Sequence, residues 1–259
     1  MLTRWAADVS PANVHPEYPR PTMARPEWLN LNGLWDFALA PAADLLPAAW
    51  AGNILVPFPV ESALSGVARR VGAGERLWYR RRFTVPPAWA GKRVLLHFDA
   101  VDWEAEVRVN GREAGTHRGG YDRFTFDVTD ALRPAGEQEV TVAVRDPADG
   151  GPQPRGKQVR APEGIFYTPV TGIWQTVWLE PVPESNIEQL RVIPDLPRGE
   201  VALAVKTTEG GIVEAVVRAE GRELARARGS AGLEFTIDVP SPRRWTPDDP
   251  FLYDLEVLL

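Results

Sequence analysis

Acidic side chains are the residues of this sequence whose spacing first suggests chemistry. Four of them fall within one short stretch: Asp99, Asp102, Glu104 and Glu106. Two neighbouring carboxyl groups held in different environments can divide the roles of acid and base. Glu104 and Glu106, however, alternate with apolar residues, which is typical of the solvated face of a strand. We therefore expect a strand surface here and not an acid–base pair.

Other catalytic groups are absent or badly spaced. The sequence has no cysteine, which excludes disulfides, thiolate nucleophiles and cysteine-bound zinc. Its histidines, His15, His97 and His117, lie far apart, without the spacing usual for metal ligands. A Gly-x-Ser-x-Gly elbow, a Gly-x-x-x-x-Gly-Lys phosphate loop and a dinucleotide fingerprint are also missing. We expect no metal and no other cofactor.

The elements that must position any site are strands. Proline and glycine number 25 and 22, and the stretches between them alternate apolar and polar residues, which is typical of a β protein. Ala105–Val109 alternates in this way. Asn110-Gly111 tolerates the positive φ of a tight turn, so we expect a hairpin that returns near Glu113–Thr116.

A second clear alternation predicts another half-buried antiparallel strand, in which Val140, Val142 and Val144 face inward. Helices are scarce, and the best candidate is the short segment Ala43–Trp50, which Pro47 begins or interrupts. The pattern therefore predicts an all-β chain with seven or eight strands in its first part.

The character of the chain changes near Pro181-Val182-Pro183, where long aromatic-rich loops give way to short strands with tight glycine turns. We expect a jelly-roll-like sandwich over residues 1–183 and an immunoglobulin-like sandwich over residues 184–259. The second has five clear strands where about seven are usual, so an edge strand is unrecognised or the last strand is missing. The five are Ile187–Ile193, Val201–Val205, Val213–Ala219, Leu233–Val239 and Phe251–Leu259.

Charge and hydropathy exclude some partners. The net charge of −6 is spread along the chain without a basic block, which argues against nucleic acid. No run of about 18 apolar residues is present, and the first residues lead into Asp, Pro and Asn without a signal-peptide core, so we expect a cytoplasmic protein with no membrane partner. The oligomeric state is left open.

Eight segments, in order and at similar spacing, resemble the front domains of family 2 glycoside hydrolases, the β-galactosidases, β-glucuronidases and β-mannosidases. Sandwich physics alone does not dictate their identity or their order, and they span nearly the whole chain. They are Arg25–Phe37, Val56–Ser62, Leu77–Phe83, Val107–Gly111, His117–Tyr121, Phe126–Thr129, Thr171–Gln175 and Trp245–Tyr253.

The resemblance implies that this sequence holds no catalytic residue. Retaining glycosidases need two carboxyl groups about 5–5.5 Å apart, and in the family an Asn-Glu pair and a second Glu supply them from a (β/α)₈ barrel. No asparagine of this chain precedes a glutamate. A barrel takes about 250 residues, for which the two sandwiches leave no room. The full-length enzyme would act on a β-glycoside, whose identity this sequence does not reveal.

The loop Gly115–Arg123 is the expected contact with substrate. It resembles the Gly-Gly-Tyr loop of β-glucuronidase-like members, and loops of this domain help to line the active-site mouth in the family. The candidate sugar-binding residues are His117, Arg118, Tyr121 and Asp122. The β-galactosidase branch has an Asp in the equivalent loop, where our register places Gly119. In the alternative, Tyr121 packs under its own hairpin and the charges are merely solvated.

Three functions fit these observations. The first is the accessory, non-catalytic part of a family 2 glycosidase, which by itself hydrolyses nothing. The second is a free-standing carbohydrate-binding protein that holds sugar rings against exposed aromatic side chains. The third is a scaffold module without sugar affinity. A reading frame that continues past Leu259 into a barrel would favour the first.

Overall fold

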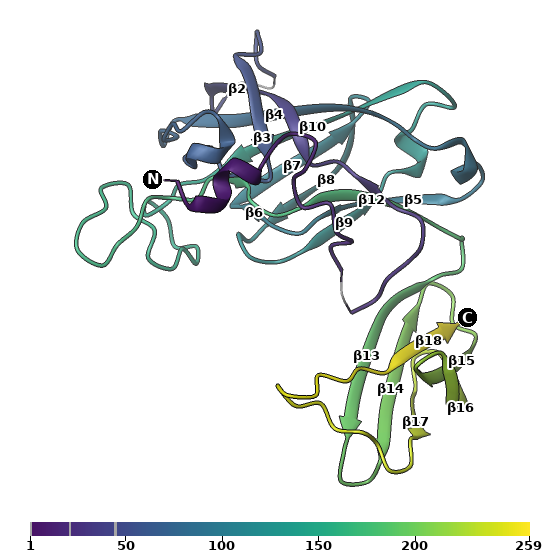
Figure 1. Cartoon of the computed structure of the whole chain (residues 1–259). Helices are drawn as coiled ribbons and strands as arrows, with labels where there is room; N and C mark the ends of the chain where they lie inside the picture. Colours follow the sequence, from purple (N-terminus) through teal and green to yellow (C-terminus); the bar gives the residue numbers. More distant parts are fainter. Residues whose placement is uncertain (1, 21, 44–45) are drawn as a thin grey trace. The chain divides into compact units, whose positions relative to one another are not determined.

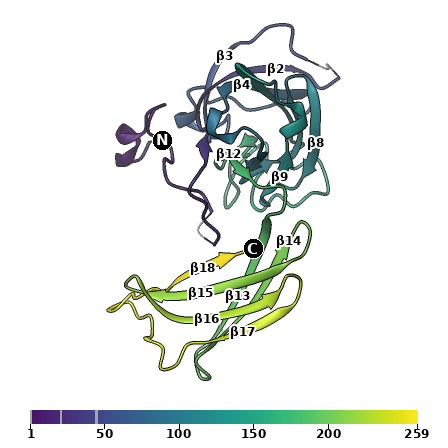
Figure 2. The same ribbon diagram turned by 90° about the vertical axis from the view of Figure 1, so that its right-hand side faces the viewer.

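The computed structural model describes residues 2–20, 22–43 and 46–259. The chain divides into two compact units, one of residues 1–19 and 25–181 and the other of residues 20–24 and 182–259. Both units consist mostly of antiparallel strands, so the predicted all-β fold is confirmed (Figures 1 and 2). Within the described part of the chain, no helix is long and apolar enough to span a bilayer.

The first unit is built from a six-stranded sheet, in the order β3-β2-β4-β10-β7-β8, and a four-stranded sheet, β1-β12-β5-β9. A short pair, β11-β6, completes it. The strands are β1 (Leu29–Asn30), β2 (Gly33–Pro41), β3 (Gly52–Val56), β4 (Glu75–Thr84), β5 (Arg93–Phe98), β6 (Val101–Asp102), β7 (Glu104–Val109), β8 (Arg112–Arg118), β9 (Phe124–Asp127), β10 (Glu137–Arg145), β11 (Gly172–Ile173) and β12 (Val177–Val182).

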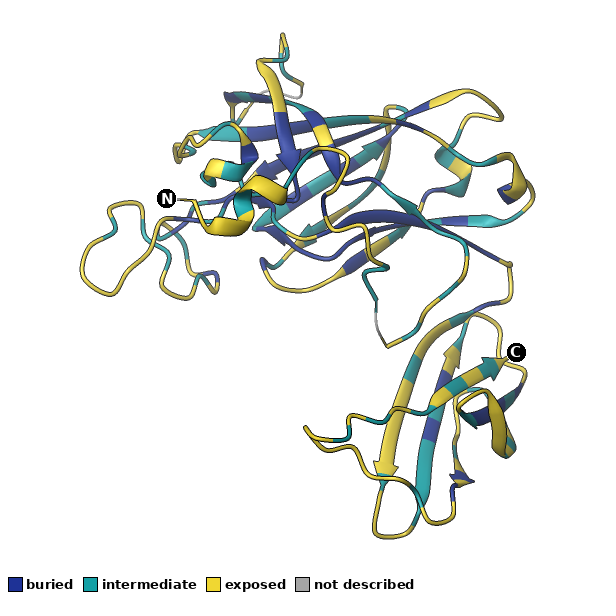
Figure 3. Ribbon diagram, viewed as in Figure 1, coloured by how far each residue is buried: buried dark blue, intermediate teal, exposed yellow. Residues whose placement is uncertain are grey.

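The core of this unit contains large aromatic and aliphatic side chains from both sheets, and its buried residues concentrate on strands such as β10 and β12 (Figure 3). Trp35 and Tyr79 are fully buried and meet edge to face at 6.3 Å. Tyr79 Oη accepts a hydrogen bond from the Ile173 amide at 3.2 Å. A Cβ on Gly172 would lie 2.0 Å from that oxygen, and its φ is +93°, so the core requires glycine there.

The hairpin predicted at Asn110-Gly111 is confirmed: β7 and β8 pair antiparallel around it, with φ of +50° and +80° at the two turn residues. The strand predicted at Val140–Val144 is present, but the prediction that it is only half-buried is wrong. β10 lies between β4 and β7 and is buried on both faces. The three valines face the main core, while Ala143 packs in a second cluster with Trp78.

The described residues contain twelve strands in the first unit, more than the seven or eight expected. Three of the twelve have only two residues and are too short for an alternation to be visible. The helix expected at Ala43–Trp50 is also wrong for the residues that the structure describes, since 46–50 form bends and irregular chain. Residues 44 and 45 of that segment lie outside the described residues. The helical segments that do form are single 3₁₀ turns: Arg4–Asp8, Ala63–Ser65, Pro87–Trp89 and Thr129–Ala131.

The second unit has two three-stranded sheets, β13-β14-β17 and β16-β15-β18. Its core consists of small aliphatic side chains such as Leu203, Val213 and Ile237, in keeping with the predicted immunoglobulin-like sandwich. The strands are β13 (Ile187–Asp195), β14 (Glu200–Thr207), β15 (Ile212–Ala219), β16 (Arg222–Ser230), β17 (Glu234–Asp238) and β18 (Asp254–Leu258).

β16 is the edge strand that the sequence did not reveal. Its inner face carries Ala225, Ala227 and Gly229, whose small side chains give a weak hydrophobic pattern. A Cβ on Gly229 would lie 2.1 Å from the Phe235 ring, so the close approach of β17 explains the glycine. With β16 the described residues of this unit contain six strands, one fewer than the usual seven.

Candidate functional site

The predicted loop Gly115–Arg123 is only partly a loop. Gly115–Arg118 forms the end of β8 and pairs with β7, so the turn itself comprises residues 119–123, ahead of β9. Gly120 is buried, and a Cβ there would lie 2.6 Å from the Asp102 carboxyl group. The turn therefore passes directly over Asp102, which only glycine allows.

Tyr121 is held at the surface of this turn by aromatic and polar contacts. Its ring meets Trp174 edge to face at 6.2 Å, and half of the residue stays exposed. The Trp174 indole N–H donates to the Gly120 carbonyl at 2.7 Å. Gln158 Nε2 lies 3.0 Å from Asp102 Oδ2 and 3.4 Å from Tyr121 Oη. The phenol is therefore fixed, with one edge available to a ligand.

Gln158 belongs to the long irregular segment 146–171, which folds back on itself beside the turn. The Tyr167 amide donates to the Lys157 carbonyl at 2.9 Å, and the Val159 amide donates to the Tyr167 carbonyl at 3.0 Å. Gln158 Oε1 accepts from the Val170 amide at 2.5 Å. One side chain thus joins both halves of this segment to the 119–123 turn.

The outer part of the same segment exposes three consecutive large apolar residues. Ile165, Phe166 and Tyr167 are 67%, 43% and 65% exposed. Large exposed apolar groups next to one another in the chain are typical of a surface that binds a ligand or another protein.

The four predicted site residues do not converge on one point. His117 stacks on Phe124 at 4.1 Å, which turns it away from Arg118, because neighbours on a strand face opposite sides. Arg118 donates through Nε and Nη2 to Glu104 at 2.9 and 2.7 Å. Asp122 is exposed and makes no hydrogen bond to the residues that the structure describes. Tyr121 and Asp122 alone belong to the turn.

The stretch Asp99–Glu106 is less solvated than expected. Glu104 and Glu106 are half-buried and paired with arginines, as a strand surface requires. Asp99 and Asp102 are buried instead, at 7% and 3% exposure. Asp99 accepts from Arg123 at 2.8 Å. The alternation that places charges outside begins only at Glu104, so the prediction of a solvated face concerns Glu104 and Glu106 and not the two aspartates.

Three carboxyl groups accept hydrogen bonds from residues of the 146–171 segment: Glu61, Asp102 and Asp146. Glu61 Oε2 accepts from the Thr171 amide at 2.9 Å, and Asp146 Oδ2 accepts from the Thr171 hydroxyl at 3.0 Å. Burial raises the pKa of Glu61 to about 7 and that of Asp102 to about 6, and the Asp146 charge adds to both effects. Burial also raises the pKa of Asp146.

Sequence reasoning missed the residues that build this surface, namely Glu61, Gln158 and Trp174. Glu61 and Trp174 lie inside motifs that resemble the family, but nothing in their spacing indicates that they meet near one turn. Gln158 lies in a segment without any periodic pattern. Fixed polar groups beside exposed aromatic edges suit the binding of sugar hydroxyls and ring faces. No group of side chains suited to a metal ion occurs among the described residues.

Comparison with known proteins gives matches over most of the chain. Residues 67–166 match the galactose-binding domain-like family of glycosyl hydrolase 2, and residues 185–259 match the glycosyl hydrolases family 2 domain. The chain is 27% identical to a β-glucuronidase of Paenibacillus borealis, over 93% of its own length and 44% of that protein. It is 31% identical to the β-galactosidase BoGH2A of Bacteroides ovatus, over 81% of its own length and 25% of that protein.

Among solved structures, the fold is similar to that of a β-glucuronidase from Ruminococcus gnavus in complex with a C6-substituted uronic isofagomine, with a TM-score of 0.75 and 22% identity. That alignment covers 94% of this chain and 44% of the other. The chain thus spans less than half the length of the relatives it matches, and the two matched ranges take up more than half of the chain. The chain belongs to glycoside hydrolase family 2 and comprises its galactose-binding-like and immunoglobulin-like front domains.

Proposed function

We propose that this chain is the accessory, non-catalytic part of a β-glycosidase and that its 119–123 turn contacts the substrate beside a catalytic barrel. The relatives, which are named β-glucuronidases and β-galactosidases, support a β-glycoside as the substrate class. The sequence of this chain has no Asn-Glu pair to supply the acid of the two catalytic carboxyl groups. On this proposal the chain positions and selects the sugar, and the chemistry occurs on another domain.

The observation that carries the proposal is the fixed, half-exposed Tyr121. Trp174 and Gln158 hold its ring and its hydroxyl, so little side-chain entropy remains to be lost when a sugar packs against it. Arg118 and Asp122 lie on either side of it in the sequence, and both are exposed charged residues. His117, which stacks on Phe124, supports the turn from the inner side.

The kinetic test uses a family 2 enzyme that carries this chain as its front part. We expect the double variant Arg118→Ala/Asp122→Ala to lower kcat/KM by about tenfold for each lost transition-state contact of about 1.4 kcal/mol. The matched control is Arg82→Ala/Glu137→Ala, an exposed ion pair at the opposite end of the same sheet. Equal kinetics in both double variants, with the fold intact, would leave the turn a structural hairpin.

The chain alone should fold and yet release no p-nitrophenol from galactosides, glucuronides, mannosides or glucosides above background. Turnover that survives repurification and disappears when a carboxylate of this chain is replaced would contradict the proposal. Calorimetric titration of the same chain with methyl β-glycosides distinguishes the alternatives. Binding that Tyr121→Ala abolishes would favour a free-standing carbohydrate-binding protein, whereas a scaffold predicts no heat.

A further inference from the structure

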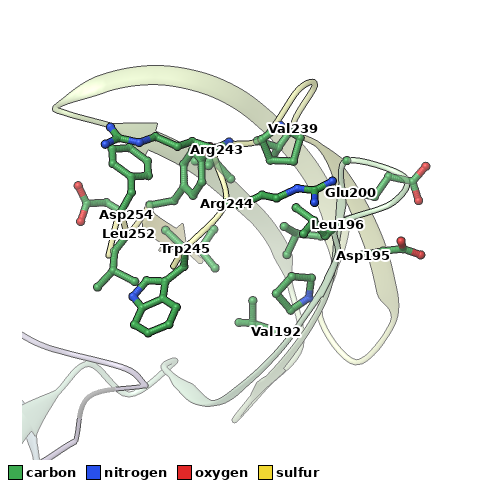
Figure 4. Close-up of a pocket in the computed structure, with 18 of the residues that line it drawn as sticks. Val192, Asp195, Leu196, Glu200, Val239, Arg243, Arg244, Trp245, Leu252 and Asp254 are labelled. Carbon is green, nitrogen blue, oxygen red and sulfur yellow. The ribbon is translucent and has the colours of Figure 1, made fainter. Parts of the chain in front are cut away.

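The first unit has a cavity of about 320 Å³ beside β1, and no residue of the 119–123 turn lines it. A larger cavity of about 530 Å³ in the second unit has a mostly apolar wall, which includes Val192, Trp245 and Leu252 (Figure 4). The smaller cavity has a different chemistry, because amides, prolines and one indole line it together. These side chains belong to Pro11, Ala12, Pro16, Trp28, Asn30 and Asn32.

The N-terminal stretch that lines the smaller cavity is fixed to the sheet by two asparagines. Asn30 Nδ2 donates to the His15 carbonyl at 2.7 Å, and Asn32 Nδ2 donates to the Val14 carbonyl at 3.3 Å. Asn32 Oδ1 accepts from the Val177 amide of β12 at 3.0 Å. These bonds hold the cavity in shape before any ligand arrives, so little chain entropy is lost on binding.

Trp28 is the aromatic side chain of this cavity, and its ring is held in place. The Tyr18 and Trp178 rings meet it edge to face at 5.5 and 6.5 Å. Trp28 is only partly buried, and its indole N–H donates to none of the residues that the structure describes. A fixed indole that combines an apolar face with one available donor suits a sugar ring, which has C–H faces and a rim of hydroxyls.

The remaining hydrogen-bonding capacity of the cavity is uncharged. An amide side chain has two N–H donors and an oxygen with two lone pairs. Asn30 uses one donor on the His15 carbonyl and one lone pair on the Asn32 amide, which leaves one of each for a hydroxyl group. No charged side chain of the described residues lines the cavity. A carboxylate or an ammonium group would therefore lose water there without gaining a partner of opposite charge.

We propose that this cavity binds one neutral pyranose ring, which packs on Trp28 and forms hydrogen bonds with Asn30. Pro11 and Pro16 supply further apolar contacts for the ring. The volume of about 320 Å³ lies at the small end of the range of about 300–1,000 Å³ that is usual for small-molecule sites, as a single sugar requires. This site belongs to the chain itself and does not depend on the proposed contact of Tyr121 with substrate.

Saturation-transfer NMR of the complete 259-residue chain tests the proposal. The probes are the methyl β-glycosides of glucose, galactose and mannose, with methyl β-glucuronide as the charged comparison. Ala12→Trp fills the cavity from an exposed position, so the core stays unchanged. The matched control is Ala135→Trp, which adds the same side chain at an exposed position ahead of β10. Trp28→Phe keeps an aromatic ring without the N–H donor, and Tyr121→Ala removes the other candidate sugar contact.

We expect at least one neutral glycoside to bind with a Kd of about 1 mM, which is ordinary for a ligand of this size. The glucuronide should bind about fivefold more weakly or less. Ala12→Trp should weaken the binding of the neutral glycoside about tenfold or more, and Trp28→Phe about threefold. Ala135→Trp and Tyr121→Ala should leave it unchanged.

Equal affinity of the Ala12→Trp and Ala135→Trp variants would overturn the proposal, because a filled cavity could not then be the site. The absence of binding for all three neutral glycosides, or tighter binding of the glucuronide, would also overturn it. Binding that Tyr121→Ala abolishes and Ala12→Trp preserves would assign the sugar to the 119–123 turn and contradict a site at Trp28.

Discussion

At the scale of single residues, two positions of the first unit are glycine because the structure leaves no space for a Cβ atom there. Gly120 passes over the Asp102 carboxyl group, and Gly172 lies against the Tyr79 hydroxyl. At both positions the missing Cβ lets one segment approach another that is distant in the sequence. The surface around Tyr121 therefore depends on two residues that have no side chain of their own.

Gly120→Ala should lower the free energy of unfolding by about 1–3 kcal/mol, because its Cβ would lie 2.6 Å from the Asp102 carboxyl carbon and force the turn to move. Gly74→Ala is the matched control, since a Cβ there meets no atom within 4 Å. Urea unfolding of the two variants checks this. A Gly120→Ala protein as stable as the control would show that the turn shifts freely.

A buried ion network anchors the N-terminal segment of the first unit. Glu180 is fully buried and accepts from Arg25 at 2.5 Å and from the Tyr18 hydroxyl at 3.1 Å. His97 Nε2 lies 3.1 Å from the same carboxyl group, and its ring stacks on Trp178 at 3.9 Å. Residues 18 and 25 are thus tied to β5 and β12 by one carboxylate.

Glu180→Ala should lower the free energy of unfolding by about 3–5 kcal/mol. It removes the carboxylate that accepts from Arg25 and faces His97, while the His97 side chain stays buried. An exposed carboxylate provides the comparison: Glu137→Ala, on a side chain that is 62% exposed, should change stability by less than about 0.5 kcal/mol. The midpoints of thermal unfolding of the two variants measure this difference in stability. Similar midpoints would mean that the buried network contributes no net stability.

At the scale of elements, three carboxyl groups couple the 146–171 segment to the sheets. Glu61 follows β3, Asp102 ends β6 and Asp146 follows β10, and each accepts a hydrogen bond from the segment or its ends. The segment has little regular structure of its own. Its position beside the 119–123 turn therefore depends on these acceptors and on Gln158.

The stability of the first unit should fall as the pH rises from about 4.5 to about 7. Glu61 has its pKa raised from 4.5 to about 7 by burial, so in this window the folded state holds a proton that the unfolded state has released. The loss for this group is on the order of 2–3 kcal/mol and levels off above pH 7.

Glu61→Gln keeps an oxygen acceptor for the Thr171 amide and cannot ionise, so it should flatten this fall. Glu137→Gln, on an exposed side chain, should retain the slope of the unmodified chain. Denaturant unfolding between pH 4.5 and 8 measures both. A Glu61→Gln variant with an unchanged slope would mean that this carboxyl group does not take up the proton.

At the scale of the whole molecule, the chain consists of two units with separate cores, one rich in aromatic side chains and one built from small aliphatic residues. Between β12 and β13, the residues Pro183, Glu184 and Ser185 are exposed and lie outside any strand. Exposed irregular backbone is what a protease needs.

Limited proteolysis should therefore cut first near Pro183–Ser185 and leave two resistant fragments, as expected for independently folded domains of residues 1–183 and 184–259. Mass spectrometry of the early fragments identifies the cut. Trypsin is unsuitable, because the linker offers no lysine or arginine, and a protease of broad specificity or one that cleaves after Glu184 is used instead. First cleavage within either sandwich would contradict this boundary.

The sequence by itself determined the all-β fold and the hairpin at Asn110-Gly111, because alternation and turn residues act over a few neighbours. The family followed from the resemblance of eight ordered segments. Only the tertiary structure decided which strands are central and what meets at the site. β10 is buried on both faces because its valines pack in the main core on one face and Ala143 packs with Trp78 in a second cluster on the other. Gln158 reaches Asp102 and Tyr121 across 56 and 37 residues of sequence. Such contacts depend on strand order and on the path of long loops, which no local pattern encodes.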